Sequence, residues 1–250
     1  MPEQDVAEQG CTAQRFVERL EQHRSAEELA KIQRYFRSGE GEYGAGDVFL
    51  GVRMGQVFAL SAEFVDMPLA EIETLLESPV HEARAGAVKI MAKQASARTA
   101  TEERRRELYE LYLRRIDRID NWDLVDLGAW DVVGRHLADK PRHVLDELAR
   151  STDVWERRTA ILSTLFFVRR GELDDTFRVA AALCGDDHDL VHKAVGGVLR
   201  EAGKKDRARL LAFLDEHAAA IPPTALRYAT AHFDADERAH YRGLRRTGRA

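Results

Sequence analysis

Helical periodicity is the feature that most constrains the fold of this chain. Apolar residues recur with the 3.6-residue spacing of an amphipathic helix, and no alternating run of strand length lies between turn signals. The sequence therefore predicts an all-α protein. The helical pattern covers residues 18–36, 68–76, 82–93, 101–119, 122–137, 144–149, 155–169, 175–184, 190–202, 206–219 and 223–233.

The helices also repeat. The segments LLESPVHEARAGAVKIM, ELARSTDVWERRTAILSTL and ALCGDDHDLVHKAVGGVLRE each read as a helix end, a polar turn and a new helix, and NWDLVDLGAWDVVG falls between the first two. The register His81, Trp122, Trp155, Leu190 gives steps of about 41, 33 and 35 residues, as in HEAT-like helix pairs. One pair cannot bury its apolar face alone, so we expect a right-handed solenoid with a concave face.

Composition places three regions along the chain. Residues 1–30 are acidic and predict a helical N-terminal segment, residues 31–235 hold the repeats, and residues 236–250 form a basic tail. We expect the end of this tail, RGLRRTGRA at residues 242–250, to be disordered. The glycine-rich stretch GEGEYGAGDVFLG, residues 39–51, lacks the strand-to-helix setting of a phosphate loop. We interpret it as a surface loop or hinge.

Composition also excludes several classes of protein. The 250 residues include 44% apolar residues, which suffices for a globular core. Cys11 and Cys184 lie far apart, with no His/Cys cluster, so we expect no metal, no cofactor and a reducing compartment. No apolar run approaches the ~20 residues of a membrane span, and the polar, acidic start does not resemble a signal peptide. We expect a soluble, cytoplasmic protein.

The net charge of −5 argues against a polyanion partner, but the distribution of the 38 bases argues for one. A GC-rich coding bias explains the excess of arginine over lysine by itself. The positions are more informative, because Arg84, Arg158 and Lys193 each lie near the start of a second helix of a repeat. They would line one concave wall, where a guanidinium can bind phosphate through two hydrogen bonds.

Asp126 is the residue that the helical pattern leaves unexplained. Asp120 or Asn121 can cap the helix and Asp123 complements its dipole, whereas Asp126 falls beside Trp122 in the apolar stripe. A buried carboxylate needs a partner or a task. Two interpretations remain open: an ion pair with Arg158 of the neighbouring repeat, and a catalytic or ligand-binding carboxylate.

The motif residues resemble those of the AlkD family of alkylpurine DNA glycosylases, which are built from HEAT-like repeats. The resemblance rests on NWDLVDLGAWDVVG, VWERRTAIL and HKAVGGVLRE and extends from about residue 32 to about residue 233. It implies that Asp126 is the catalytic aspartate and that Trp122 lies against the deoxyribose of the lesion. It also implies that Arg158, Lys193 and Arg200 lie at the DNA backbone, and that double-stranded DNA with cationic alkylated purines is the substrate, cleaved without base flipping.

One position departs from the family pattern. Many members carry a second tryptophan directly after the glycine of the Lys-Ala-x-Gly motif, where this chain has Gly197. Losing an indole removes roughly 150–250 Å² of contact surface. We therefore expect a wider cleft that favours bulky N7- or N3-purine adducts, as in family members that protect producers of DNA-alkylating antibiotics.

The remaining candidates keep two interpretations each. Trp155 is a packing anchor or a DNA contact, Trp130 is a core residue or a second wall of the site, and Arg200 pairs with Glu201 or contacts DNA. The basic tail would add salt-sensitive, nonspecific DNA affinity. We expect a monomer, associated with the nucleoid through DNA. The alternative function is a non-catalytic HEAT-type module that binds DNA or protein.

Overall fold

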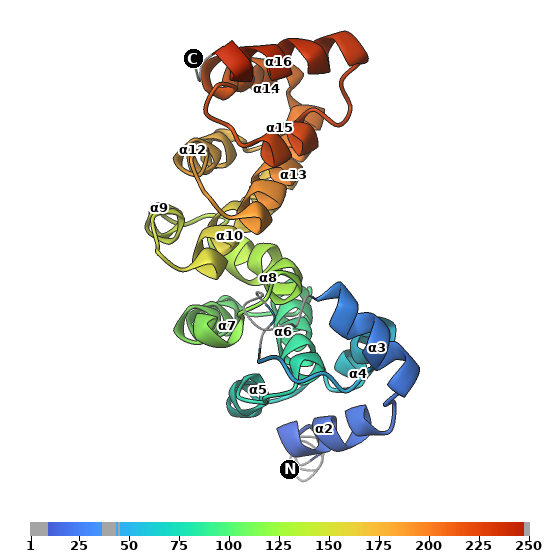
Figure 1. The fold of residues 1–250 in the computed structure, drawn as a ribbon. Helices are drawn as coiled ribbons and strands as arrows, with labels where there is room; N and C mark the ends of the chain where they lie inside the picture. Colours follow the sequence, from blue (N-terminus) through green and yellow to red (C-terminus); the bar gives the residue numbers. More distant parts are fainter. Residues whose placement is uncertain (1–9, 37–43, 45, 248–250) are drawn as a thin grey trace. The chain divides into compact units, whose positions relative to one another are not determined.

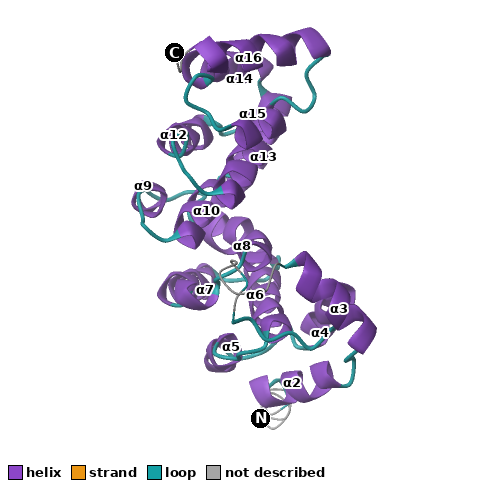
Figure 2. Cartoon of the chain, viewed as in Figure 1, coloured by secondary structure: helices purple, strands orange, loops and turns teal. Residues whose placement is uncertain are grey.

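The computed structural model describes residues 10–36, 44 and 46–247. Over these residues the chain is built from helices joined by loops (Figure 2), and the one β feature is an isolated parallel bridge between Val48 and Val80. The predicted all-α class is confirmed. No helix in this part of the chain is long and apolar enough to cross a membrane.

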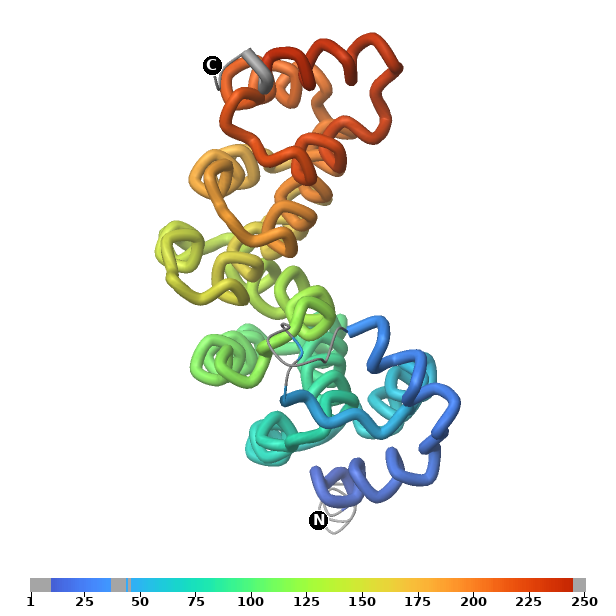
Figure 3. Tube along the Cα trace, viewed as in Figure 1, coloured from blue at the N-terminus to red at the C-terminus, as the bar shows by residue number. Residues whose placement is uncertain are grey.

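The chain divides into two compact units, Met1–Val132 and Val133–Ala250, which are described separately. In the first unit α6 packs against α2, α4, α5, α7 and α8. Figures 1 and 3 show α6 passing between α4 and the pair α5 and α7. The helices of this unit are α2 (Ala13–Glu21), α3 (Ala26–Tyr35), α4 (Met54–Glu63), α5 (Leu69–Leu76), α6 (His81–Ser96), α7 (Glu102–Arg114), the 3-10 turn η1 (Ile116–Arg118) and α8 (Trp122–Gly128).

In the second unit α13 is the central helix and packs against α10, α11, α12, α14 and α15. The π-helix η2 (Ala129–Gly134) contains the boundary between the units. The other helices are α9 (Val144–Ala149), α10 (Val154–Ser163), α11 (Leu165–Arg170), α12 (Asp174–Ala182), α13 (Asp189–Lys205), α14 (Arg207–His217), α15 (Pro223–Ala229) and α16 (Ala235–Thr247).

The predicted repeat register coincides with helix starts. His81 and Trp122 are the first residues of α6 and α8, while Trp155 and Leu190 are the second residues of α10 and α13. Polar side chains fix several of these starts: Asn121 accepts the Trp122 N–H at 2.8 Å, and Asp153 accepts the N–H groups of Trp155 and Glu156 at 2.7 and 3.1 Å. The solenoid and its concave face stay predictions.

Several predicted elements were wrong in detail. The helix expected at 18–36 is broken between α2 and α3, where Ser25 caps α3, and the helix expected at 155–169 is broken at Thr164. The helix α4 was missed. The tail expected to be disordered forms α16 as far as Thr247, with residues 248–250 outside the described part. Its acidic first turn, with Asp236 and Glu237, favours a helix there.

The glycine-rich stretch also differs from the prediction. Residues 39–43 and 45 lie outside the described part, but Phe49, Leu50 and Val52 are buried. Glu82 on α6 accepts the N–H groups of Leu50, Gly51 and Val52 at 2.9–3.2 Å. Residues 49–52 are therefore a buried strap on α6, whereas Gly46 and Val48 just before them are exposed, as expected of a surface loop.

Two adjacent glycines of α13 have opposite surroundings. A Cβ at Gly196 would lie 2.3 Å from the Ala225 carbonyl oxygen and 2.6 Å from the Tyr228 Cβ, so this glycine permits the close approach of α13 and α15. A Cβ at Gly197 would meet no described atom of its unit within 4 Å. Gly196 is therefore required for packing, whereas Gly197 faces open space.

We expect Gly196→Ala to lower the melting temperature by several degrees, because the added Cβ collides with the backbone of α15. Gly197→Ala is the matched control one residue away. It should leave stability unchanged or raise it by about 0.5–1 kcal/mol, because alanine is the better helix former. Thermal unfolding of the two variants measures the difference, and equal melting temperatures would contradict this account of the α13–α15 contact.

Candidate functional site

The exposed face of α8 carries a carboxylate between two tryptophans. Asp126 is exposed, and Trp122 and Trp130 are each half-buried, one turn before and one turn after it. This corrects the prediction that Asp126 lies in the buried stripe. The half-buried indole of Trp130 leaves both of its interpretations open, a core residue or a wall of the site.

The direction in which α8 packs explains why Asp126 is exposed. The residues that α8 buries most fully are Leu124, Val125 and Gly128, and successive helical residues are about 100° apart. Asp126 therefore points roughly opposite to the centre of that face. Gly128 is needed there, because a Cβ would lie 2.7 Å from Tyr112 and from Val88. Apolar spacing alone predicted the wrong edge of the stripe.

Two aromatic residues from the end of α3 support Trp122. The Phe36 ring stacks on the indole with centroids 5.5 Å apart and an interplanar angle of 18°. The Tyr35 ring meets the indole edge-on at 5.7 Å and 72°, while 67% of Tyr35 is exposed. Neither residue stood out in the sequence, because a Tyr-Phe pair at a helix end is also common in cores.

Behind Phe36 lies a second aromatic layer that ends on His81. The centroid of the His81 ring is 4.9 Å from that of Phe36 and 4.8 Å from that of Phe49, and the two phenylalanine rings are 5.2 Å apart. His81 is fully buried. The indole of Trp122 therefore rests on a packed aromatic stack within the first unit.

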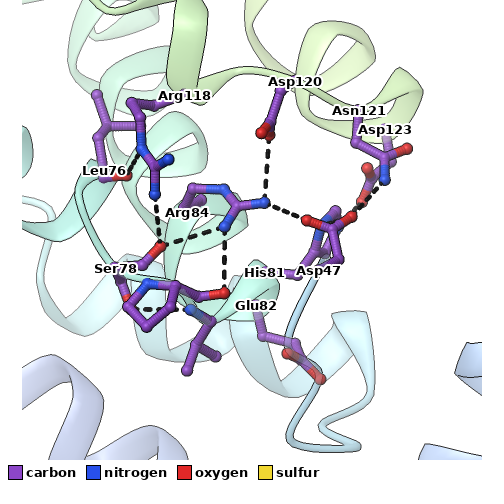
Figure 4. A network of polar contacts seen from close by, with 12 residues as sticks. Asp47, Leu76, Ser78, His81, Glu82, Arg84, Arg118, Asp120, Asn121 and Asp123 are labelled. Atoms are coloured by element: carbon purple, nitrogen blue, oxygen red, sulfur yellow. Dashed lines mark hydrogen bonds and ion pairs between the residues drawn. The ribbon is translucent and has the colours of Figure 1, made fainter. Parts of the chain in front are cut away.

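His81 is shared between two carboxylates (Figure 4). Its Nε2 is 2.8 Å from an oxygen of Asp123, in the first turn of α8, and its Nδ1 is 3.4 Å from an oxygen of Asp47. Burial alone would lower the pKa of His81, but the hydrogen bond to Asp123 and the negative charges of Asp123 and Asp47 raise it to about 9. The ring is therefore an imidazolium at neutral pH.

Arg84 belongs to the same network and was predicted to face DNA (Figure 4). Its Nη2 donates to Asp47 at 2.5 Å and to Asp120 at 3.2 Å, and its Nη1 donates to the carbonyls of Ser78 and Pro79. The side chain is only 3% exposed. The structure therefore gives Arg84 a task in the fold: it neutralises Asp47 and closes the turn before α6.

Asp47 is the centre of this network. Besides His81 and Arg84, it accepts the Asn121 amide N–H at 2.8 Å, which fixes the capping residue of α8. Burial would raise the pKa of Asp47, but His81 and Arg84 hold it below its usual value. The sequence offered one signal for this residue, a lone aspartate in a glycine-rich stretch, and that signal is too weak to predict such a role.

In the second unit, two of the predicted DNA contacts are buried. Trp155 is 8% exposed and Arg158 is 6% exposed. The Nη1 of Arg158 donates to the carbonyl oxygen of Leu190, near the start of α13. Trp155 therefore fits the packing interpretation. The ion pair between Asp126 and Arg158 would join the two units and stays a prediction.

The other two predicted contacts lie on α13 and are half-exposed. The Nζ of Lys193 is 2.7 Å from Asp189, with 39% of its side chain exposed, and the Nε of Arg200 is 3.1 Å from Glu201, with 34% exposed. The pairing of Arg200 with Glu201 is confirmed. Such exposed pairs are weak, so a phosphate can replace the carboxylate at little cost.

The position of a residue, counted from the start of its helix, distinguishes the side chains that close turns from the candidate site residues. The fourth residues of α6, α10 and α13 each contact a carbonyl six residues earlier: Arg84 that of Ser78, Arg157 that of Ser151, and His192 that of Asp186. The fifth residues of α8, α10 and α13 are Asp126, Arg158 and Lys193. The predicted row of bases, Arg84, Arg158 and Lys193, was therefore wrong at Arg84. Arg84 is the fourth residue of its helix and closes the preceding turn, whereas Arg158 and Lys193 are fifth residues.

The described residues contain no group of three or more His, Cys, Asp or Glu side chains placed to hold a metal ion. The burial of Cys184 raises the pKa of its thiol to about 12, so it is a core residue rather than a nucleophile. The side chains that the structure places on the exposed face of α8 are the carboxylate of Asp126 and the indole of Trp122.

Comparison with known proteins identifies the family. The chain resembles a solved structure described as a predicted DNA alkylation repair enzyme from Enterococcus faecalis, with a TM-score of 0.66 and 19% identity over 85% of this chain and 98% of that one. At this identity the likeness shows the fold alone. No curated protein matches the chain. The model of the DNA alkylation repair enzyme family matches residues 16–233, and the chain therefore belongs to that family.

Proposed function

We propose that this protein is a monofunctional DNA glycosylase that hydrolyses the N-glycosidic bond of cationic N7- or N3-alkylated purines. The observation that carries the proposal is the exposed carboxylate of Asp126 on the same face of α8 as Trp122. Membership of a DNA alkylation repair family supports DNA as the substrate. We expect it to act as a monomer in the cytoplasm, associated with the nucleoid.

The chemistry needs little besides a fixed negative charge. Alkylation at N7 or N3 makes the purine a cation, so the base leaves with the electron pair of the C1′–N bond and becomes neutral. Positive charge then builds on the deoxyribose, as in glycoside hydrolysis, and Asp126 stabilises it. A water molecule adds to C1′, and the same carboxylate can accept its proton. No general acid and no metal take part.

The exposure of Asp126 supports recognition without base flipping. A carboxylate on an outer helix face reaches the sugar of a nucleotide that remains stacked in the duplex. Trp122, held by Phe36, offers an aromatic surface to the positively charged sugar and base. Trp130, at the ninth position counted from the start of α8, is the candidate for a second aromatic wall.

Phosphate contacts fit Lys193 and Arg200 best, because both are half-exposed bases on α13. Arg158 supports them through the Leu190 carbonyl, which it holds near the start of the same helix. Its own contact with phosphate, implied by the resemblance, remains a prediction. Arg84 and Trp155 are left out of the proposed surface because their side chains are buried. Arg158 is as buried as they are, so its place at a phosphate rests on the resemblance alone.

The lesion preference follows from Gly197. A Cβ at this position would meet no described atom of its unit within 4 Å, which supports the proposal that no side chain here limits the size of the adduct. We propose that bulky N7- or N3-purine adducts, such as those of DNA-alkylating antibiotics, are preferred over methylated bases. Self-resistance of an antibiotic producer is the biological setting that this preference fits.

Asp126→Asn should reduce the single-turnover rate of base release roughly 100-fold or more, because the amide cannot stabilise the charge on the sugar. Affinity for DNA should change by no more than a few-fold. Asp187→Asn is the control, since that carboxylate has 97% of its side chain exposed elsewhere on the molecule. Retained excision in Asp126→Asn would overturn the site assignment.

The alternative function, a non-catalytic binding module, gives a different result in the same assay. Wild type would then bind DNA in a salt-dependent manner without releasing any base from it. That result would overturn the glycosylase proposal and leave DNA binding intact.

Gly197→Trp should shift selectivity toward small lesions. The indole enters open space, so the fold should be retained, and it narrows the side of the site. We expect the ratio of excision rates, bulky N7-guanine adduct over 7-methylguanine, to fall at least several-fold, with Gly197→Ala as the control near wild type. An unchanged ratio, or a wild type that prefers 7-methylguanine, would contradict the wide-cleft proposal.

A further inference from the structure

We propose that His81 is a positioning residue of this site: its ring, shared between Asp47 and Asp123, holds Trp122 and the start of α8 in place. The proposal deepens the glycosylase function and rests on it for its catalytic consequence. Its structural part concerns the first unit alone and can be tested without any substrate.

The first connection runs through the backbone of α8. Asp123 follows Trp122 directly and lies three residues before Asp126 in the same short helix. Its carboxylate is nearly buried, with 12% of the side chain exposed, and is anchored at 2.8 Å by the Nε2 of His81. Its other oxygen has no hydrogen-bond partner among the described residues. His81 is thus the described anchor of this side chain.

The second connection runs through ring packing. His81 contacts Phe36 at 4.9 Å between centroids, and Phe36 stacks on the face of the Trp122 indole at 5.5 Å. One face of the Trp122 indole is therefore held by the aromatic stack, and the backbone of Trp122 is held through the neighbouring Asp123. Both supports lead to the same imidazole.

The ring can serve both carboxylates only while it is protonated. An imidazolium has two N–H groups, one for Asp123 and one directed at Asp47, whereas a neutral ring has one. Proton loss turns one N–H into a lone pair that faces a carboxylate in a buried site. It also leaves two negative charges separated by a neutral ring.

Other charged groups around His81 do not replace the lost charge. Arg84, on the same helix, is bound to Asp47 and Asp120, and Glu82 accepts the N–H groups of Leu50, Gly51 and Val52. Asn121, from the start of α8, donates to Asp47 as a neutral amide. Asp47 thus retains partners after proton loss, while Asp123 loses the charge on its anchor.

The direction of the pH effect follows from the raised pKa of His81. The folded form binds the proton up to about pH 9, against an ordinary value of 6.5, so the contribution of the protonated ring to the stability of the fold is fully present below about pH 6.5, and the anchoring is lost as the pH rises through 9. Above that pH we expect Trp122 to become mobile and Asp126 to lose its fixed position.

The test follows the indole N–H of Trp122 and the ring of His81 by NMR between pH 6.5 and 10 on the full chain. In wild type both signals should shift with one midpoint near pH 9. In His81→Gln the Trp122 signal should be constant over that range, and in His217→Gln, the control, it should behave as in wild type. Trp122→Phe assigns the signal.

A second variant keeps the test valid if His81→Gln folds poorly. Asp123→Asn keeps an acceptor but removes the charge, so the common midpoint should move to lower pH. The proposal would be overturned if the Trp122 signal did not shift as His81 titrates, or if it shifted with the same midpoint in His81→Gln as in wild type.

The catalytic part is measured separately. If the glycosylase function holds, base release under single-turnover conditions should fall above pH 9 in wild type, after subtraction of release from DNA alone. In His81→Gln it should be lower and independent of pH. If wild type releases no base at all, the glycosylase function fails while the NMR result still decides the role of His81.

Discussion

The interaction on which the candidate site depends is the buried ion pair of His81 with Asp123. It fixes the first turn of a helix only seven residues long, which could not hold its own position through helix propensity alone. Asp47 completes the arrangement, because it joins His81, Arg84 and the capping Asn121 to the segment that leads into the buried strap of residues 49–52. Asp126 is exposed and Trp122 is half-buried, yet the residues that support them are buried.

Turn-closing residues also lie directly beside candidate site residues at the starts of other helices. The fourth residue of α6, α10 and α13 closes the preceding turn from within the protein. The fifth residue of α8, α10 and α13 is Asp126, Arg158 or Lys193, and these are the residues that the family resemblance connects with DNA. One residue of register thus separates a side chain that closes a turn from a side chain that the proposal places at the substrate. The sequence repeat alone cannot resolve a difference of one residue.

Helix positions and the repeat starts were predictable, because apolar periodicity and capping residues are local signals. The motif around Asp126 was also recognisable. Its burial was not, since the side of α8 that packs is decided by contacts such as that of Gly128 with Tyr112 and Val88. The acid that is buried proved to be Asp123, whose described partner, His81, lies 42 residues earlier in the chain. Contacts over such separations leave no pattern in a single sequence.

The central claim is that this protein breaks the N-glycosidic bonds of alkylated purines in DNA. The most direct measurement is mass spectrometry of bases released by the wild-type protein from DNA treated with a panel of small and bulky alkylating agents. The account predicts free N7- or N3-alkylated purines, with bulky adducts released fastest, and abasic sites left in the DNA. Intact alkylated DNA after incubation with folded, DNA-binding protein would contradict it.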